Sequence, residues 1–306
     1  MSFLFTTSEL SSTPVARLVR GVARLLIPWL AAWFGMLIVQ ACAPRLQSVS
    51  AGAAIWAVLG LAFWTYWELT LRRRRGLRPL HSQLRYFAVI ELISEWRRDL
   101  PKSPELLEVG SGPIGLGELW PGPFTGCDAR FDGPTSSNMK AVVGSATALP
   151  FPDGSFDLVV SVDMVEHLPS RSQRERALKE LARVSRGIVI VGFPCGSDAE
   201  KADRELAQAC RKRGLAVPAW LEEHLANGLP KANLPESALR GVVIRRYPSE
   251  SARSHLWVMT RDWSPFTSFA LSLVQAGAPR LLRWIFHLLS RTTRHPYRQF
   301  YLIKTK

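Results

Sequence analysis

A glycine-rich turn in the middle of the chain is the first feature that suggests a ligand-binding site. Glu105–Gly115 predicts a short buried strand that runs into this turn, in which Gly110 and Gly112 flank Ser111. Glycines there let the backbone bend sharply and let a ligand approach without a Cβ in the way. Asp128 ends the next apolar run, eighteen residues after Gly110. A carboxylate at the end of that neighbouring strand is placed to accept hydrogen bonds from both hydroxyls of a ribose.

These two features fit more than one class of protein. Gly110–Gly115 matches the pattern GxGxxG, and Asp128 lies near the distance expected for the acid of a dinucleotide-binding fold. An NAD(P)-dependent oxidoreductase is therefore one interpretation. An ordinary turn from a strand into a helix, without a ligand, is another.

The segments around the turn predict an α/β fold. Apolar runs alternate with stretches of helical pattern, which is typical of a parallel sheet covered on both faces, with ligands bound beyond the carboxyl ends of the strands. The predicted strands are the start of Glu105–Gly115, Phe124–Asp128, Ala141–Val143, Phe156–Ser161, Gly187–Phe193, Val242–Tyr247 and Gln299–Lys304. Two capping boxes are predicted, each with a glycine that ends its helix: Ser172 with Glu175 before Gly187, and Ser197 with Glu200 before Gly214.

Three further features distinguish between these interpretations. Glu108 lies two residues before the first glycine. Gly144–Val160 contains the run Leu-Pro-Phe-Pro-Asp-Gly-Ser-Phe-Asp, which a dehydrogenase has no reason to contain, and Ser161–Leu168 follows it. Gln299–Lys304 predicts a final strand. Together these features resemble the class I S-adenosylmethionine-dependent methyltransferases, in particular the branch that includes quinone-biosynthetic and glycan-modifying enzymes.

The resemblance is strong over residues 104–195 and loose over residues 196–306. It implies S-adenosyl-L-methionine as the cofactor and a Rossmann-like, doubly wound sheet of seven strands with an antiparallel last strand. In it, Glu108 and the glycine turn would hold the methionine end, Asp128 the ribose hydroxyls, and Ser145–Thr147 would border the adenine. The implied cofactor-binding residues are Glu108, Gly110, Ser111, Gly112, Asp128, Ser145, Ala146, Thr147 and Ser161. Two residues depart from the family pattern: Ser145 replaces a common acid, and Ile114 replaces a frequent third glycine.

The segment Ser161–His167 would face the methyl group and the acceptor. Methyl transfer mainly requires alignment, and a base is needed only if the acceptor arrives protonated. His167 is the best candidate for that base, because an imidazole can take a proton near neutral pH. Glu166 and Asp163 are weaker candidates, and a carboxylate there has positioning of the cofactor or acceptor as its alternative role. His167 has packing beneath the site as its alternative.

Other residues with chemical potential receive no role at this stage. His224 and His255 lie in the half of the chain with the weaker resemblance. The four cysteines are scattered and form no CxxC pair, so the sequence predicts neither a disulfide framework nor a zinc site. We therefore expect no metal.

The net charge of +14 lies at the two ends of the chain. Residues 1–80 carry +7, residues 251–306 carry +8, and the 170 residues between them carry −1. Both basic ends are also rich in apolar residues, and this combination fits an anionic membrane surface better than a nucleic acid. Nucleic acid is therefore not expected as a partner.

Two uncharged runs near the N-terminus predict a membrane hairpin. Residues 25–44 and 46–67 are each long enough to cross about 30 Å of hydrocarbon as a helix. Arginines precede the first run and follow the second, which predicts that both flanks lie in the cytoplasm. A signal peptide cleaved near Ala41-Cys42-Ala43 is one alternative, although Pro44 makes a poor cleavage site. A buried helical hairpin is another.

The predicted organisation has three parts. Residues 1–78 form the membrane anchor, 79–103 a linker helix, and 104–306 the methyltransferase domain. Within that domain, residues 215–240 form an insertion that we interpret as a substrate or partner element. Residues 263–290 are predicted to lie in the lipid headgroup region, with a core helix as the alternative. In the linker helix, Val89, Ile93, Trp96 and Leu100 form a stripe that favours core packing, with a lid over the acceptor as the alternative.

The leading hypothesis from the sequence is a multi-pass protein of the cytoplasmic (inner) membrane whose catalytic domain faces the cytoplasm. Its acceptor would be a small molecule or a membrane compound: a lipid-linked glycan, a quinone or polyprenyl compound, or a lipid headgroup. An NAD(P)-dependent oxidoreductase and a non-catalytic, membrane-anchored cofactor-binding scaffold are the alternatives. The acceptor atom and the oligomeric state cannot be deduced from the sequence.

Overall fold

The structure is a computed structural model that describes residue 60 and residues 80–239, 243–261 and 293–305. The chain divides into two compact units, residues 1–77 and 78–306. Apart from Gly60, every residue described below belongs to the second unit.

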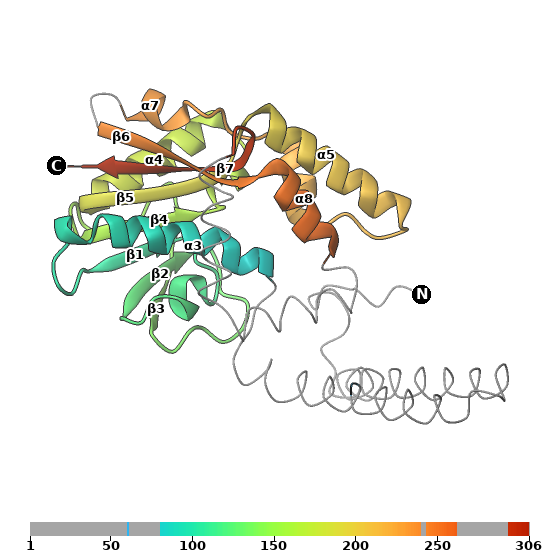
Figure 1. Cartoon of the computed structure of the whole chain (residues 1–306). Coiled ribbons are helices and arrows are strands. Elements are labelled where there is room, and N and C mark those ends of the chain that lie inside the picture. The colour runs from blue at the N-terminus through green and yellow to red at the C-terminus, as the bar shows by residue number, and fades with distance from the viewer. Residues whose placement is uncertain (1–59, 61–79, 240–242, 262–292, 306) are drawn as a thin grey trace, which may run out of the picture. The chain divides into compact units, whose positions relative to one another are not determined.

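One mixed sheet of seven strands forms the centre of this unit, in the order β3-β2-β1-β4-β5-β7-β6 (Figure 1). The strands are β1 (Leu106–Val109), β2 (Phe124–Asp128), β3 (Met139–Val143), β4 (Phe156–Val162), β5 (Ser185–Pro194), β6 (Val243–Ser251) and β7 (Pro296–Lys304). The first five strands pair in parallel, whereas β7 lies antiparallel between β5 and β6. This confirms the predicted Rossmann-like sheet with an antiparallel last strand.

Helices surround this sheet. They are α3 (Leu80–Glu95), α4 (Arg171–Val184), α5 (Gly196–Lys212), α6 (Ala219–Asn227), α7 (Leu234–Ala238) and α8 (Ala252–Arg261). Three short 3-10 helices lie at Arg97–Asp99, Gly115–Glu118 and Val165–His167. The predicted insertion, residues 215–240, contains α6 and α7.

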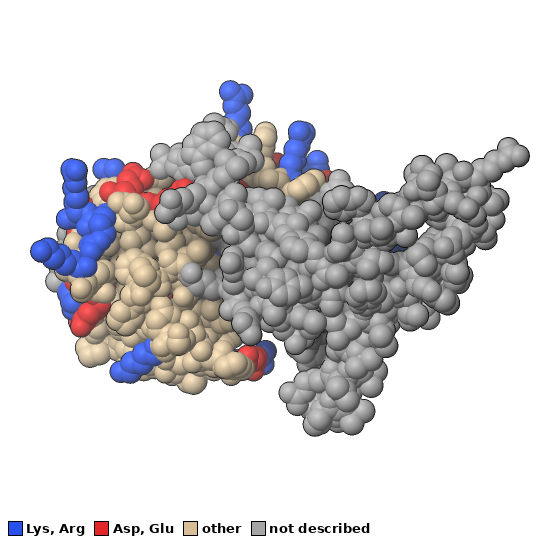
Figure 2. Space-filling model, turned by 60° about the horizontal axis from the view of Figure 1, so that its bottom comes forward, with Lys and Arg blue, Asp and Glu red and all other residues tan. Residues whose placement is uncertain are grey.

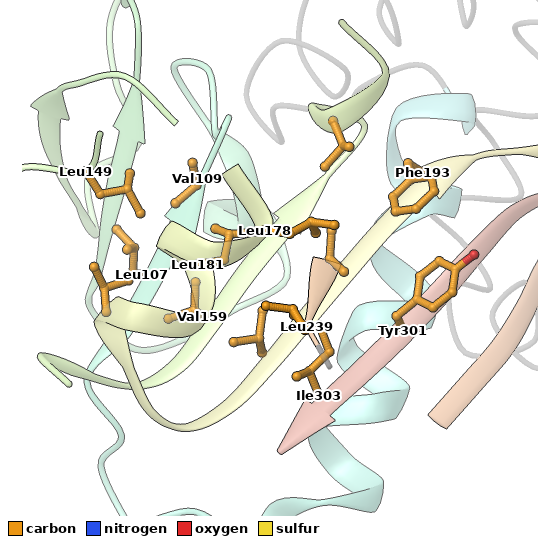
Figure 3. Packing of buried hydrophobic residues seen from close by; sticks show 14 of the residues in the cluster. Leu107, Val109, Leu149, Val159, Leu178, Leu181, Phe193, Leu239, Tyr301 and Ile303 are labelled. Atoms are coloured by element: carbon orange, nitrogen blue, oxygen red, sulfur yellow. The ribbon is translucent and has the colours of Figure 1, made fainter. Parts of the chain in front are cut away.

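The central strands are apolar on both sides because helices cover both faces of the sheet. In β5, Val189 and Val191 point to one face, and Ile188 and Ile190 point to the other. On the first face, Leu178 of α4 is completely buried in the same core cluster (Figure 3). The labelled side chains in that view fill the space between this face of the sheet and the helices that cover it. The rings of Phe193 and Tyr301 stack there at 5.1 Å between centroids.

Helix α3 covers the opposite face, where Val89, Ile93 and Leu100 are buried and Trp96 is half-buried against the same cluster (Figure 1). This confirms the predicted stripe as core packing. The linker helix predicted over residues 79–103 was too long, because α3 ends at Glu95 and a 3-10 turn follows.

The predicted start of α4 was wrong by about half a turn. Ser170 caps this helix, and its Oγ accepts a hydrogen bond of 3.2 Å from the backbone N–H of Gln173. Ser172 does not form the expected box, because the Glu175 carboxylate instead accepts from Arg171 at 2.7 Å.

The ends of the next helices also differ in part from the prediction. Gly187 does not close α4 but lies within β5, where a Cβ would come within 2.6 Å of the Asp157 carbonyl oxygen. The box predicted at Ser197 and Glu200 was wrong too, because α5 begins at Gly196 without a side-chain cap. The stop near Gly214 was correct, since α5 ends at Lys212.

None of the helices in the described residues combines the length and the apolar character needed to cross a bilayer. The spans predicted at 25–44 and 46–67 lie outside the described residues except for Gly60, and the interfacial segment predicted at 263–290 lies wholly outside them.

Replacement of a central strand residue tests this core. Leu158 of β4 is 0% exposed, and Leu158→Ala should lower the free energy of unfolding by about 2–5 kcal/mol because it opens a cavity. The measurement is chemical denaturation of the full chain in detergent, followed by circular dichroism. Leu225→Ala makes the same change at a residue of α6 that is 38% exposed, and should cost about 0.5 kcal/mol. Equal losses in both variants would contradict the central position of β4.

Candidate active site

The predicted site residues meet at one edge of the sheet. Strands β3, β2, β1 and β4 are parallel neighbours, so their carboxyl ends lie side by side. Gly110 follows β1, Asp128 ends β2, Ser145 follows β3 and Asp163 follows β4. The structure therefore brings the implied cofactor-binding residues and the Ser161–His167 segment to the same edge, as the α/β prediction required.

The glycine turn is fixed to the neighbouring strand and requires glycine for steric reasons. Gly110 has φ +77°, and a Cβ there would lie 2.7 Å from the Cβ of Met164. Gly112 has φ +55°, and its backbone N–H donates to Asp128 Oδ2 at 2.7 Å. Apart from its two chain neighbours, no described residue has a heavy atom within 4 Å of the place where a Cβ of Gly112 would stand. The turn thus leaves space for a ligand beside the half-buried Asp128 carboxylate.

Glu108 of β1 supports this turn through hydrogen bonds. Its carboxylate is 0% exposed and accepts hydrogen bonds from the Leu116 backbone N–H at 2.7 Å and from the Tyr86 hydroxyl at 2.8 Å. Glu108 therefore joins β1, the far end of the turn and α3. A direct contact between Glu108 and the methionine end of a cofactor stays a prediction.

The segment implied to border adenine forms a tight turn after β3. Ser145 Oγ lies 2.9 Å from Thr147 Oγ1 and accepts from the Thr147 backbone N–H at 3.3 Å. Ser145 is exposed, whereas Ala146 and Thr147 are half-buried. On the other side of the site, Ser111 is buried and donates to the Gly112 carbonyl oxygen at 3.0 Å.

Ionic contacts fix the turn after β4. Asp163 has φ +52°, and Arg298 of β7 donates to its two carboxylate oxygens at 2.6 and 2.7 Å. Arg85 of α3 lies 3.5 Å from the same carboxylate. Burial raises the pKa of Asp163, but the charges of Arg298 and Arg85 outweigh burial and hold this pKa below its usual value. Asp163 is therefore a stable anion that positions the turn, and it is poorly suited to be the base.

The other residues of this turn differ in their surroundings. Ser161 and Glu166 are 0% exposed, and neither Ser161 Oγ nor the two carboxylate oxygens of Glu166 has a hydrogen-bond partner among the residues that the structure describes. Burial and the negative charge of Asp163 raise the pKa of Glu166 well above its usual value. His167 ends the 3-10 helix Val165–His167, and its side chain is 32% exposed. Of the three predicted catalytic residues, His167 has the most exposed side chain, since that of Asp163 is 14% exposed and Glu166 is buried.

Sequence reasoning missed the partners of these residues. Glu223 of α6 lies 2.7 Å from His167 Nδ1, and His224 of α6 lies 4.0 Å from Glu166. Arg298 is 135 residues away from Asp163 along the chain. A short motif carries no signal for contacts of this separation. Glu223 and His224 lie within residues 215–240, whose role as a substrate or partner element stays a prediction.

The turn does not suit the pyrophosphate of a dinucleotide. In dinucleotide-binding folds the glycine turn leads into an α-helix whose free N–H groups bind the phosphates. Here it leads into the 3-10 helix Gly115–Glu118, and carboxylates already occupy the N–H groups of Gly112 and Leu116. Two carboxylates near this turn would repel a pyrophosphate. They are compatible with S-adenosylmethionine, whose sulfonium is cationic and whose ribose needs acceptors.

Arg298→Met tests the ionic anchor of the site. It leaves Asp163 as a buried anion without its main cation, and it removes one partner of the 3% exposed Glu250, which also lies 3.3 Å from His255. We expect a loss of about 3–5 kcal/mol in the free energy of unfolding, measured by denaturant titration. Arg171→Met removes an arginine from the exposed pair with Glu175 and should cost less than about 1 kcal/mol. A neutral effect of Arg298→Met would contradict the anchoring role.

Comparisons with known proteins agree with this site. Residues 118–191 match the family model described as "Methyltransferase domain". A protein named as a methyltransferase in Encephalitozoon cuniculi (strain GB-M1) is 40% identical over 79 residues, which cover 26% of this chain and 37% of that protein. Ajmaline N-methyltransferase from Rauvolfia serpentina is 34% identical over 90 residues, which cover 28% of this chain and 30% of that protein.

Among solved structures, a protein from Galdieria sulphuraria named as a sarcosine dimethylglycine methyltransferase aligns with 15% identity and a TM-score of 0.45, over 74% of this chain and 87% of that one. The alignments span 37% and 30% of the lengths of the two curated relatives. Within these bounds, residues 118–191 are similar to methyltransferase domains, the type of domain that uses S-adenosylmethionine.

Proposed function

We propose that the whole protein transfers a methyl group from S-adenosylmethionine to an acceptor at a membrane. The observation that carries the proposal is the open space above Gly112 beside the Asp128 carboxylate, at the same sheet edge as the Ser161–His167 turn. When bound, S-adenosylmethionine supplies a methyl group on a positively charged sulfur, which an electron pair of the acceptor can attack.

The residues of the chain bind and orient the reactants in this proposal. The turn Gly110–Gly112 holds the methionine end, Asp128 accepts from the ribose, and Ser145–Thr147 border the base. Asp128 Oδ2 already receives the Gly112 N–H, and Oδ1 receives a long hydrogen bond of 3.3 Å from the Arg130 N–H. Each carboxylate oxygen therefore keeps acceptor capacity for a hydroxyl.

His167 is the residue that would take a proton from the acceptor. Its Nδ1 lies 2.7 Å from a Glu223 carboxylate oxygen, and this contact fixes the ring and favours the tautomer with the proton on Nδ1. The Nε2 atom is then the proton acceptor. The glycine turn and the Ser161–His167 turn are both fixed by contacts within the protein. This serves the main requirement of methyl transfer, which is alignment of the two reacting atoms.

The membrane acceptor is proposed from the sequence. Residues 25–44 and 46–67 are uncharged, and arginines flank them on the sides that the positive-inside rule assigns to the cytoplasm. A membrane-held enzyme gains most if its acceptor is held there too, as a lipid-linked glycan, a quinone or polyprenyl compound, or a lipid headgroup. On the face drawn in Figure 2, Lys and Arg of the described residues alternate with Asp and Glu around a broad area of other residues. This mixture of charges does not favour a nucleic acid as the acceptor.

Cofactor binding is the first test. Calorimetric titration of the full chain in detergent should give saturable binding of S-adenosylmethionine and none of NAD. Asp128→Asn keeps an oxygen for the Gly112 N–H but removes the charge, and should weaken binding by about 1.5–3 kcal/mol, roughly ten- to a hundredfold. Asp132→Asn, at a side chain that is 76% exposed, should bind like the unmodified chain. Binding of NAD instead would sink the proposal and favour an oxidoreductase.

The acceptor class is tested with a labelled methyl group. The full chain, S-adenosylmethionine labelled in its methyl group, and either a membrane lipid extract or an aqueous extract are incubated separately. Label is expected in the lipid extract and should fall at least tenfold with Asp128→Asn. Label in the aqueous extract alone would refute the membrane acceptor. Cofactor binding without label in either extract would favour the non-catalytic scaffold.

A further inference from the structure

Three side chains with metal-binding atoms meet beside the turn after β4. Glu166 and His167 belong to that turn, and His224 belongs to α6 of the inserted segment. One carboxylate oxygen and one nitrogen from each imidazole all lie within 4.8 Å of one another. An ion that holds its ligands at about 2.0–2.2 Å needs them no more than about 4.4 Å apart, so small side-chain adjustments would bring all three atoms onto one ion.

The atoms that face this cluster lack hydrogen-bond partners in the part of the chain that the structure describes. Among those residues, both carboxylate oxygens of Glu166 and the Nε2 atom of His224 are buried without a hydrogen bond. Glu166 is 0% exposed and His224 is 5% exposed, and Glu166 Oε1 lies 4.0 Å from His224 Nε2. Buried polar atoms in proteins almost always have a partner, because a buried atom without one costs free energy. A cation between these atoms would satisfy all of them.

The two histidines are also held in the way that metal-bound histidines are held. His224 Nδ1 lies 2.9 Å from an Asp203 carboxylate oxygen, and the other oxygen of Asp203 accepts from the Tyr297 hydroxyl at 2.8 Å. His167 Nδ1 lies 2.7 Å from Glu223. A carboxylate on one ring nitrogen fixes the ring and leaves the other nitrogen with a lone pair for a metal ion. Both rings therefore offer Nε2.

We propose that Glu166, His167 and His224 bind one divalent transition-metal ion. Two imidazole nitrogens and one carboxylate suit Zn²⁺, Fe²⁺, Mn²⁺ or Co²⁺, whereas Mg²⁺ and Ca²⁺ prefer sites made wholly of oxygen. Three protein ligands leave at least one coordination position open. We predicted no metal from the sequence, because that prediction depended on the spacing of the cysteines and assigned no role to His224.

The position of the ion defines what it would do, and this step rests on the proposed methyl transfer. The Ser161–His167 turn is the part of the site that would face the acceptor. An acceptor hydroxyl at the open position of the ion loses its proton more readily, because the cation stabilises the resulting anion, and the proton passes to water. His167 is then a ligand of the ion and not the free base. This role narrows the proposed acceptors to compounds that carry a hydroxyl group able to coordinate a metal ion.

Cobalt is a suitable probe because Co²⁺ bound to nitrogen and oxygen ligands absorbs visible light. The full chain, purified in detergent without a polyhistidine tag and treated with a chelator, is titrated with CoCl₂. We expect one Co²⁺ per chain, seen as a saturable visible absorption that Zn²⁺ abolishes. His224→Gln and Glu166→Gln should each weaken Co²⁺ binding by at least about a hundredfold, since loss of a ligand exceeds the tenfold to hundredfold loss caused by outer partners.

His295 provides a matched control. Its Nδ1 lies 2.9 Å from the Asp198 carboxylate, as that of His224 does from Asp203, but its side chain is 73% exposed and lies outside the cluster. His295→Gln should bind Co²⁺ like the unmodified chain. Circular dichroism of each variant shows whether it is folded, and calorimetric binding of S-adenosylmethionine reports on the cofactor separately from the ion.

Three results would overturn the metal site: no saturable Co²⁺ absorption, Co²⁺ binding unchanged in a folded His224→Gln or Glu166→Gln variant, or an equal loss in His295→Gln. If one of the two ligand variants fails to fold, the other decides. Co²⁺ binding without binding of S-adenosylmethionine would support the metal site and refute the proposed methyl transfer.

Discussion

The geometry of the site depends on the buried ion pair between Asp163 and Arg298. Asp163 follows β4 with φ +52°, a backbone conformation that residues other than glycine rarely adopt. Arg298 donates to both carboxylate oxygens of Asp163. The same guanidinium donates to Glu250 of β6 at 2.8 Å. Burying three charges is costly, and it is tolerated only where the hydrogen bonds are nearly complete. The antiparallel insertion of β7 between β5 and β6 is what delivers Arg298 to this position.

The glycine turn and the Ser161–His167 turn act as one unit because they are in contact. A Cβ at Gly110 would lie 2.7 Å from Met164, the residue that follows Asp163. The position of the second turn thus dictates glycine in the first, in addition to any requirement of a ligand. From the other side, Glu108 joins the glycine turn to Tyr86 of α3, and Arg85 of the same helix lies 3.5 Å from Asp163. Contacts that orient the glycine turn therefore also orient the Ser161–His167 turn.

Local features of the fold could be predicted from the sequence, and contacts between distant segments could not. Strand β2 has the predicted bounds, and α5 ends at Lys212, near the stop predicted at Gly214. These signals depend on apolar runs and on backbone conformations that glycine favours. The start of α4 was missed because Ser170 competes with Ser172 for the same N–H groups within two residues. Arg298 and His224 were missed because their roles arise only when β7 and α6 pack against the turn after β4.

The first residues of β7 connect the two halves of the inferred metal environment. Tyr297 and Arg298 are consecutive but contact different partners. The Tyr297 hydroxyl donates to Asp203, which orients His224. Arg298 fixes Asp163, which begins the turn that carries Glu166 and His167. A ligand on α6 and two ligands after β4 are therefore positioned by one strand. Helix α6 belongs to residues 215–240, which we interpreted as a substrate or partner element. The strand that fixes the turn after β4 therefore also fixes this element.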